Sequence, residues 1–293
     1  MTSTTPFTPG HTASGDSPVG APRQTYRWRG HSIAYYAAGE GAPLLLVHSI
    51  NAAASAFEMR KPFAGLQTGR RVYALDLLGY GSSDRPPRAY SADEYAALIG
   101  DFAREVIGAP AAVVASSLGA AFTIRAAARH QQQFTALALA CPTGVEQLVR
   151  PAQPGLAYRL LRGPLGDLVF TLLTSRPGIR LFLGRQAYHD PRAIDAVTLE
   201  GFHRAARQPG AKYAPICFLT GLLNCDVRED FGRLTQPVLL LWGRQATTTP
   251  LDQARAFLRL NPRARLTVID RANLLIQDER PEEFQAAVAG FLA

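Results

Sequence analysis

The sequence Val113-Val114-Ala115-Ser116-Ser117-Leu118-Gly119-Ala120-Ala121-Phe122 joins a β-branched apolar run, a pair of serines and an alanine-rich run. This order predicts a strand, a sharp turn and a helix. Small residues stand two positions before and two positions after Ser117, where a larger side chain would collide with the strand or the helix. We therefore expect Ser117 at the top of a sheet with its hydroxyl exposed. A helix that begins at about Leu118 would direct its unpaired backbone N–H groups at any oxyanion formed there. The alternative is an ordinary buried strand that runs into a helix with two incidental serines.

Strands and helices alternate on both sides of this stretch. Predicted strands cover 26–36 (two short strands about a turn at Gly30), 43–49, 71–76, 113–116, 135–141, 237–243 and 264–270. Predicted helices cover 52–66, 91–107, 118–130, 251–260 and 281–292. Several of the strands are continuous apolar runs, which are typical of strands buried on both faces. The pattern predicts an α/β protein with a doubly wound, mostly parallel sheet.

The alternation stops at Pro142. Between residues 145 and 234 the sequence has helical periods such as 158–173 and 191–206, separated by Pro and Gly, and no convincing strand. We expect this segment to be a helical lid inserted into a core formed by residues 25–144 and 235–293. Residues 1–24 are rich in Thr, Pro, Gly and Ser and lack a basic start and an apolar run, so a disordered tail is expected and not a signal peptide.

The composition restricts the classes of partner. The chain has 293 residues, of which 47% are hydrophobic and 18% charged, which suits one large domain with an insertion. Its net charge of +8 comes from scattered arginines, because Lys61 and Lys212 are the only lysines. Without a basic run or interleaved aromatic residues, no nucleic-acid partner is expected. No run approaches the roughly 20 apolar residues of a membrane span, so no membrane partner is expected either.

The cysteines give no metal-ligand pattern. Cys141, Cys217 and Cys225 form no CxxC pair, and reduced thiols in a cytoplasmic protein are the simplest account of them. We expect no metal and no cofactor, and a small molecule as the partner. The sequence does not indicate an oligomeric state.

Five motifs occur in the order and spacing of a known superfamily. They are His48-Ser49, the loop DLLGYGSS at residues 76–83, the turn at Ser117, Trp242-Gly243 and DERPEEF at residues 278–284. From about Tyr26 to its C-terminus the chain resembles the α/β-hydrolase fold superfamily, of the lidded type with a serine nucleophile. The resemblance implies a hydrolase of small ester or acyl substrates that acts through Ser, Asp and His in that chain order, with the substrate held between lid and sheet. It implies Ser117 as the nucleophile and the N–H groups of Ile50 and Leu118 as the oxyanion hole.

Two triad positions depart from the family pattern. The acid is expected three residues after the glycine of Trp-Gly, where Ala246 stands, and the histidine five residues before the Glu of Asp-Glu-Arg-Pro, where Leu274 stands. A shift of register leads to Gln277, which is not a base, and no histidine follows His203. Removing a triad member leaves about 10³–10⁴-fold catalysis over water, so a triad without acid and base implies a slow enzyme.

Other residues are candidate surrogates for the missing groups. His48 lies beside the site, although a histidine there more often orders its loop, and Gln277 occupies the shifted register. His189 or His203 could descend from the lid, and Glu146 could supply an acid. The sequence therefore leaves open whether the chain is an enzyme. A hydrolase with a displaced base, a non-hydrolytic pseudoenzyme that binds or rearranges a small apolar ligand, and an interaction scaffold that uses the lid all remain.

Overall fold

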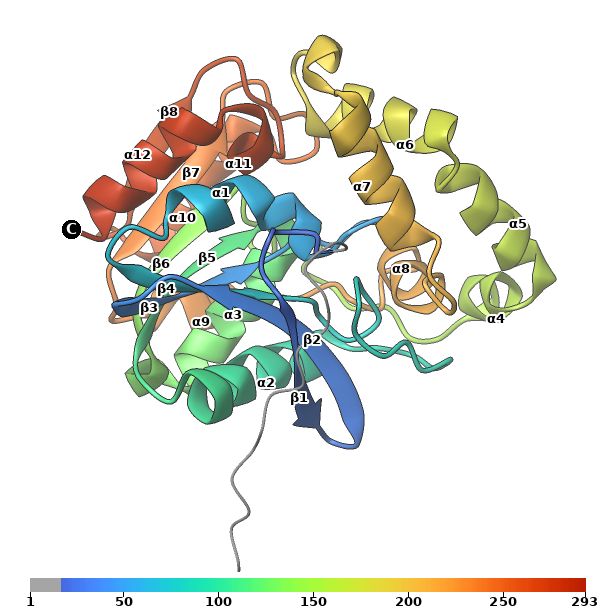
Figure 1. Ribbon diagram of the computed structural model, residues 1–293, viewed down its shortest axis with the longest axis horizontal. Coiled ribbons are helices and arrows are strands. Elements are labelled where there is room, and N and C mark those ends of the chain that lie inside the picture. The colour runs from blue at the N-terminus through green and yellow to red at the C-terminus, as the bar shows by residue number, and fades with distance from the viewer. Residues whose placement is uncertain (1–16) are drawn as a thin grey trace, which may run out of the picture.

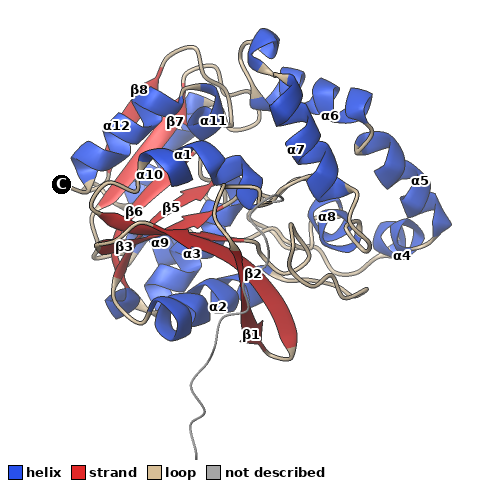
Figure 2. Ribbon diagram, viewed as in Figure 1, coloured by secondary structure: helices blue, strands red, loops and turns tan. Residues whose placement is uncertain are grey.

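The predicted α/β class with a mostly parallel sheet is confirmed in the computed structural model, which describes residues 17–293. One eight-stranded sheet has the order β1-β2-β4-β3-β5-β6-β7-β8. Its strands are β1 (Arg23–Trp28), β2 (His31–Ala38), β3 (Ala42–Val47), β4 (Arg70–Leu75), β5 (Ala111–Ser116), β6 (Phe134–Ala140), β7 (Val238–Gly243) and β8 (Arg265–Ile269). Strand β2 is antiparallel to β1 and β4, and all pairings from β4 through β3 to β8 are parallel. Figure 2 shows helices on both sides of the strands.

The helices follow in chain order. They are α1 (Arg60–Gly65), α2 (Ala92–Phe102), α3 (Ser117–Arg129), α4 (Leu156–Arg162), α5 (Pro164–Leu173), α6 (Arg176–Phe182), α7 (Ala196–Ala206), α8 (Tyr213–Leu219), α9 (Arg228–Gly232), α10 (Ala254–Leu260), α11 (Ile276–Glu279) and α12 (Pro281–Phe291). Short 3-10 helices include η2 (Ala56–Met59), η6 (Pro191–Ala193) and η7 (Leu251–Gln253), and π turns η3 (Ala103–Ile107) and η5 (Leu183–Ala187) extend α2 and α6. Within residues 17–293, no helix combines the length and the apolar character needed to cross a bilayer.

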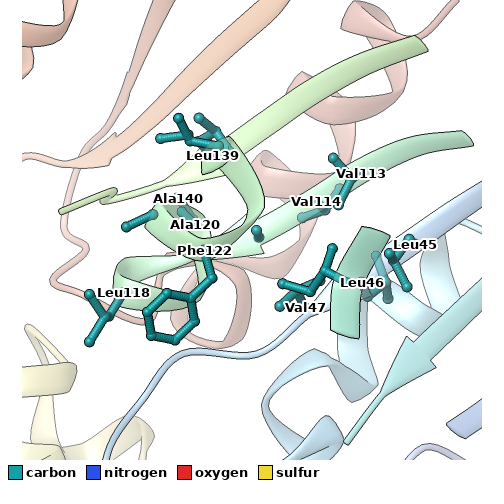
Figure 3. Close-up of a cluster of buried hydrophobic side chains, with 14 of the residues drawn as sticks. Leu45, Leu46, Val47, Val113, Val114, Leu118, Ala120, Phe122, Leu139 and Ala140 are labelled. Atoms are coloured by element: carbon teal, nitrogen blue, oxygen red, sulfur yellow. The ribbon is translucent and has the colours of Figure 1, made fainter. Parts of the chain in front are cut away.

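The central strands are apolar because both of their faces are covered. All six residues of β5 are buried, and Figure 3 shows side chains of β3, β5 and β6 gathered around α3. Leu46, Val114, Leu139 and Phe122 in this cluster are completely inaccessible to solvent. The apolar runs that predicted these strands thus report burial on both sheet faces.

Several helix boundaries differ from the prediction for local reasons. The helix expected over 158–173 is two helices, because Gly163 is extended and Pro164, which has no N–H to donate, begins α5. The helix expected over 191–206 splits into η6 and α7, where the Asp195 side chain accepts the N–H of Thr198 at 2.6 Å. The helix expected from residue 52 begins only at Ala56, after Ser55 caps it.

The chain between β6 and β7 contains helices α4 to α9 and no strand. Figure 1 shows α4 to α8 standing beside one end of the sheet, whereas α9 contacts the core helices α3 and α10. A second apolar cluster joins this insertion to the core. Its members include Phe57, Ile179, Leu183, Tyr188, Phe202 and Leu275.

The expected disordered tail is only partly within the described residues. Residues 1–16 lie outside them. Residues 17–24 are ordered, because Val19 and Ala21 are buried, the Ser17 hydroxyl accepts their N–H groups, and Arg23 begins β1. The ordered chain therefore starts before the expected boundary at residue 25.

Candidate active site

The topology brings the carboxyl ends of β3 and β5 together. These strands are parallel neighbours with Val47 opposite Ala115, and the chain leaves β3 toward β4 on one side and β5 toward β6 on the other. The loops that follow two such strands diverge and leave a crevice at their carboxyl ends, where ligands bind in open α/β sheets. Residues 48–51 and 116–118 lie at this point.

Ser117 stands in a strained conformation between β5 and α3. Its φ is 53°, in the left-handed region, while Ser116 before it is extended. A residue other than glycine in this region costs on the order of 1–3 kcal/mol and is held there by its surroundings. The strained strand–turn–helix arrangement predicted around Ser117 is therefore confirmed. The residue is less exposed than predicted, because only 9% of the Ser117 surface is accessible to solvent.

A close backbone contact sets the loop after β3 against the first turn of α3. A Cβ atom on Gly119 would lie 2.1 Å from the carbonyl oxygen of His48, so only glycine allows this approach. The N–H of Leu118 is among the first four of α3, which have no partner within the helix. The N–H of Ile50 has no acceptor among residues 17–293. Two backbone N–H groups without an acceptor in the described chain thus lie near the carboxyl ends of neighbouring strands.

The positions to which the resemblance assigns the acid and the base hold buried apolar side chains. Ala246 and Leu274 are 6% and 8% exposed and belong to the main apolar core. The loops that carry them lie together, since the N–H of Thr247 bonds Asn273 Oδ1 at 3.1 Å. Neither side chain can accept or donate a proton.

Gln277 lies against the turn that carries Ser117. Its Nε2 is 3.5 Å from Ser116 Oγ, so α11 reaches the start of α3. Its Oε1 is buried and has no hydrogen-bond partner in the described part of the chain. This amide can bind a ligand but cannot serve as a base near neutral pH.

His48 does not have a free nitrogen for Ser117. Its Nδ1 donates to the carbonyl of Ser49 at 2.6 Å, and its Nε2 accepts the N–H of Leu77 at 3.1 Å. Burial lowers its pKa to about 4. These contacts argue against His48 as a surrogate base, because the ring orders two loops and its lone pair is already used.

Of the other candidate surrogates, His189 and Glu146 are exposed and His203 is partly buried. His189 is exposed, and its backbone N–H donates to Glu279. His203 Nδ1 lies 3.8 Å from the exposed Glu200, and Glu146 Oε1 lies 3.4 Å from the exposed Arg259. In residues 17–293 no hydrogen bond joins any of the three to Ser117.

Glu58 is the residue of the site that sequence reasoning missed. It is fully buried on η2, where Oε2 accepts the N–H of Ser49 at 3.0 Å and Oε1 accepts Asn51 Nδ2 at 2.7 Å. No cation pairs with it among the described residues, and burial raises its pKa to about 7. A charged residue inside a predicted helix gives no signal of such burial, because charged side chains in helices are mostly exposed. The carboxyl group holds the segment that carries the N–H of Ile50.

The shifted pKa of Glu58 predicts a pH-dependent stability. The pKa of Glu58 in the folded protein exceeds its ordinary value of 4.5, so burial favours the protonated carboxyl group. The contribution of this group to the free energy of unfolding is therefore fully present below pH 4.5 and is lost as the pH rises through about 7. The free energy of unfolding of the wild type relative to Glu58→Gln should fall by roughly 2.5 kcal/mol between pH 5 and pH 8. Urea unfolding at both pH values measures it, with the exposed Glu40→Gln variant as control. The lowered pKa of His48 reduces the stability of the protein as the pH falls below 6.5, but it does so equally in the wild type and in Glu58→Gln. A difference that does not change with pH would contradict the prediction.

A buried ion cluster fixes α11 beside the site. The Asp278 carboxylate accepts hydrogen bonds from both terminal nitrogens of Arg60, at 2.7 and 2.9 Å, and lies 2.9 Å from Lys61 Nζ. Arg60 also donates to Thr198 Oγ1 on α7 at 2.8 Å. The neighbouring Glu279 carboxylate accepts backbone N–H groups from both the loop after β8 and the insertion. The cluster therefore ties α1, α11 and the insertion together.

A metal site has no candidate ligands here. No group of three His, Cys, Asp or Glu side chains lies close enough to hold an ion in the region from residue 17 onward. The chemistry of the site rests on hydroxyl, amide, carboxyl and backbone N–H groups.

The chain is similar to proteins of known family. A model described as "Alpha/beta hydrolase family" matches residues 44–287. The chain is 25% identical to 2-hydroxy-6-oxo-6-(2'-aminophenyl)hexa-2,4-dienoic acid hydrolase of Metapseudomonas resinovorans, over 88% of this chain and 87% of that protein. It is 27% identical to 2-hydroxymuconate semialdehyde hydrolase of Pseudomonas sp. (strain CF600), over 87% of this chain and 88% of that protein. Among solved structures, a serine hydrolase involved in carbazole degradation superposes with a TM-score of 0.78 and 20% identity, over 92% of this chain and 98% of that one.

Proposed function

The chain belongs to the alpha/beta hydrolase family, and we propose that it is a serine hydrolase of small ester or acyl substrates with Ser117 as its nucleophile. The observation that carries the proposal is the left-handed backbone of Ser117 at the β5–α3 junction. Small-molecule hydrolases among its relatives support a small substrate with a carbonyl group.

The arrangement supports the first half of an acyl transfer. Ser117 Oγ attacks the substrate carbonyl, and the N–H groups of Leu118 and Ile50 stabilise the oxyanion; one such donor is worth about 10²–10³-fold in rate. The bond between the carbonyl carbon and the leaving group breaks as that group takes up the hydroxyl proton of Ser117. A water molecule then adds to the acyl carbon, the bond to Oγ breaks, the acid is released and a proton of the water returns to Oγ. With Ala246 and Leu274 at the acid and base positions, no imidazole takes the serine proton, so turnover is slow. The reaction needs no metal and no cofactor.

Residues 145–234 act as the lid in this proposal. The second apolar cluster supports this role, since Phe202 and Leu183 of the insertion pack with Phe57 and Leu275 from the loops around the site. Closure over these loops would shield the substrate and the oxyanion from bulk solvent. The three buried, unpaired cysteines support a reducing, cytoplasmic location.

A second candidate function is a non-hydrolytic one. The apolar, buried side chains of Ala246 and Leu274 favour it, because a protein that binds or rearranges a small apolar ligand needs no triad. The polar groups of Gln277 and Asn51 would then orient the ligand.

Labelling with a fluorophosphonate serine probe tests the proposal. We expect the wild type to be labelled, Ser117→Ala to be unlabelled, and Ser116→Ala to keep its label, because Ser117 alone of the pair has the strained backbone. A panel of short-chain aryl esters measures turnover in the same proteins. If the wild type showed no labelling and no turnover above the level of Ser117→Ala, the hydrolase proposal would be overturned and the non-hydrolytic one favoured.

A further inference from the structure

Exposed apolar side chains are concentrated in one part of the insertion. In the described chain, seven of the ten exposed large apolar residues lie between positions 156 and 181. We call them the leucine face: Leu156, Leu160, Leu165, Leu168, Leu172, Leu173 and Leu181. The exposed fractions of Leu156, Leu168 and Leu172 are 72%, 60% and 62%. Exposed apolar side chains concentrated in this way mark an interaction site.

The leucine face is ordered by helix periodicity. Leu165, Leu168 and Leu172 follow the spacing i, i+3, i+7 and so share one side of α5, and Leu156 and Leu160 share one side of α4. Helix α5 packs mainly against α4 and α6, while α7 contacts η2 of the core. Figure 1 accordingly shows α5 as the outermost helix of the insertion. No element from residue 17 to the C-terminus covers these leucines.

The charges among these leucines are positive. Arg159, Arg180 and Arg185 are exposed and form no ion pair with any described residue. The one carboxylate between residues 156 and 185, Asp167, is paired with Lys212 at 2.6 Å. The segment that carries the leucine face therefore also carries three exposed, unpaired cations.

We propose that the leucine face docks on an anionic lipid surface. Helices that lie in a membrane interface place leucines among the acyl chains and arginines at anionic headgroups, which matches both observations. A second copy of the chain is the less favourable occupant, because pairing two such faces brings like charges together. In this proposal the leucine face binds the surface of the bilayer, and no helix crosses it. The sequence predicted no membrane partner because it contains no apolar run long enough to span a bilayer. Docking on the surface of a bilayer does not require such a run. The inference does not depend on the proposed hydrolase activity.

Co-sedimentation of the full chain with vesicles tests the inference. We expect binding to phosphatidylglycerol–phosphatidylcholine vesicles to be at least roughly tenfold stronger than to pure phosphatidylcholine vesicles, and to weaken in 0.5 M NaCl. The double variant Leu168→Gln/Leu172→Gln should bind roughly tenfold more weakly. Because both side chains are exposed, its circular dichroism and unfolding midpoint should equal those of the wild type. The variant Leu266→Gln, exposed on β8 at the sheet edge, is the matched control and should bind as the wild type does.

Each contrary outcome overturns the inference. Absence of binding, equal binding to both kinds of vesicle, or an equal loss in Leu266→Gln would do so. Analytical ultracentrifugation without lipid tests whether a second copy of the chain occupies the leucine face. A dimer that is lost in Leu168→Gln/Leu172→Gln would identify the face as a contact between copies and overturn the proposal.

Discussion

The variant Gly119→Ala is expected to destabilise the fold strongly. The added Cβ would lie 2.1 Å from the carbonyl oxygen of His48 and 3.5 Å from a methyl group of Val47. The first contact is with backbone at the end of the central strand β3, so no side-chain rotation relieves it. Overpacking a core costs about 1–3 kcal/mol and more where the backbone has to move, in a domain whose total stability is about 5–15 kcal/mol. We expect a loss of at least about 3 kcal/mol, seen as a lower urea midpoint and a low yield of folded protein.

Gly290→Ala is the matched control for this prediction. Gly290 lies on α12, and a Cβ there has no atom within 4 Å. Alanine is the better helix former by about 1 kcal/mol, so this variant should be as stable as the wild type or more stable. Equal midpoints for the two variants would show that α3 does not pack against His48 as described.

The variant Asp278→Asn is expected to destabilise the protein by about 3–5 kcal/mol, because it leaves the largely buried Arg60 without its counterion. Asp278 is fully buried, and the side chain of Arg60 is 14% exposed. Removing one partner of such a cluster exposes the full desolvation cost of the others. Urea unfolding measures the loss, and the fluorophosphonate reaction of Ser117 should slow as well, since Gln277 next to Asp278 contacts Ser116.

Glu200→Gln serves as the control for the ion cluster. Glu200 pairs with Arg176 at 2.8 Å, but both side chains are more than half exposed, so the pair contributes at most about 1 kcal/mol. A loss in Asp278→Asn no larger than that in Glu200→Gln would mean that the cluster is solvated and does not hold α11.

The sequence alone was sufficient for the strands, the helical insertion and the strained turn at Ser117. Those features depend on local patterns: apolar runs, serine between small residues, and Pro or Gly between helical periods. Its errors were also local. The split at Gly163 and the late start of η2 reflect caps and proline chemistry that hydrophobic periodicity does not report.

Only the tertiary structure decided which side chains share the site. Arg60 and Asp278 are 218 positions apart, and Leu77 and His48 are 29 apart, so no local pattern links them. Periodicity reports that a residue is buried but not what it touches, which is why Glu58 was overlooked and His48 was considered as a base. The backbone contact at Gly119 and the exposure of the leucines on α5 likewise follow from how distant segments pack. The order of the elements was therefore readable from residue types, whereas the proton-binding and packing properties of the site arise from contacts that only the folded chain creates.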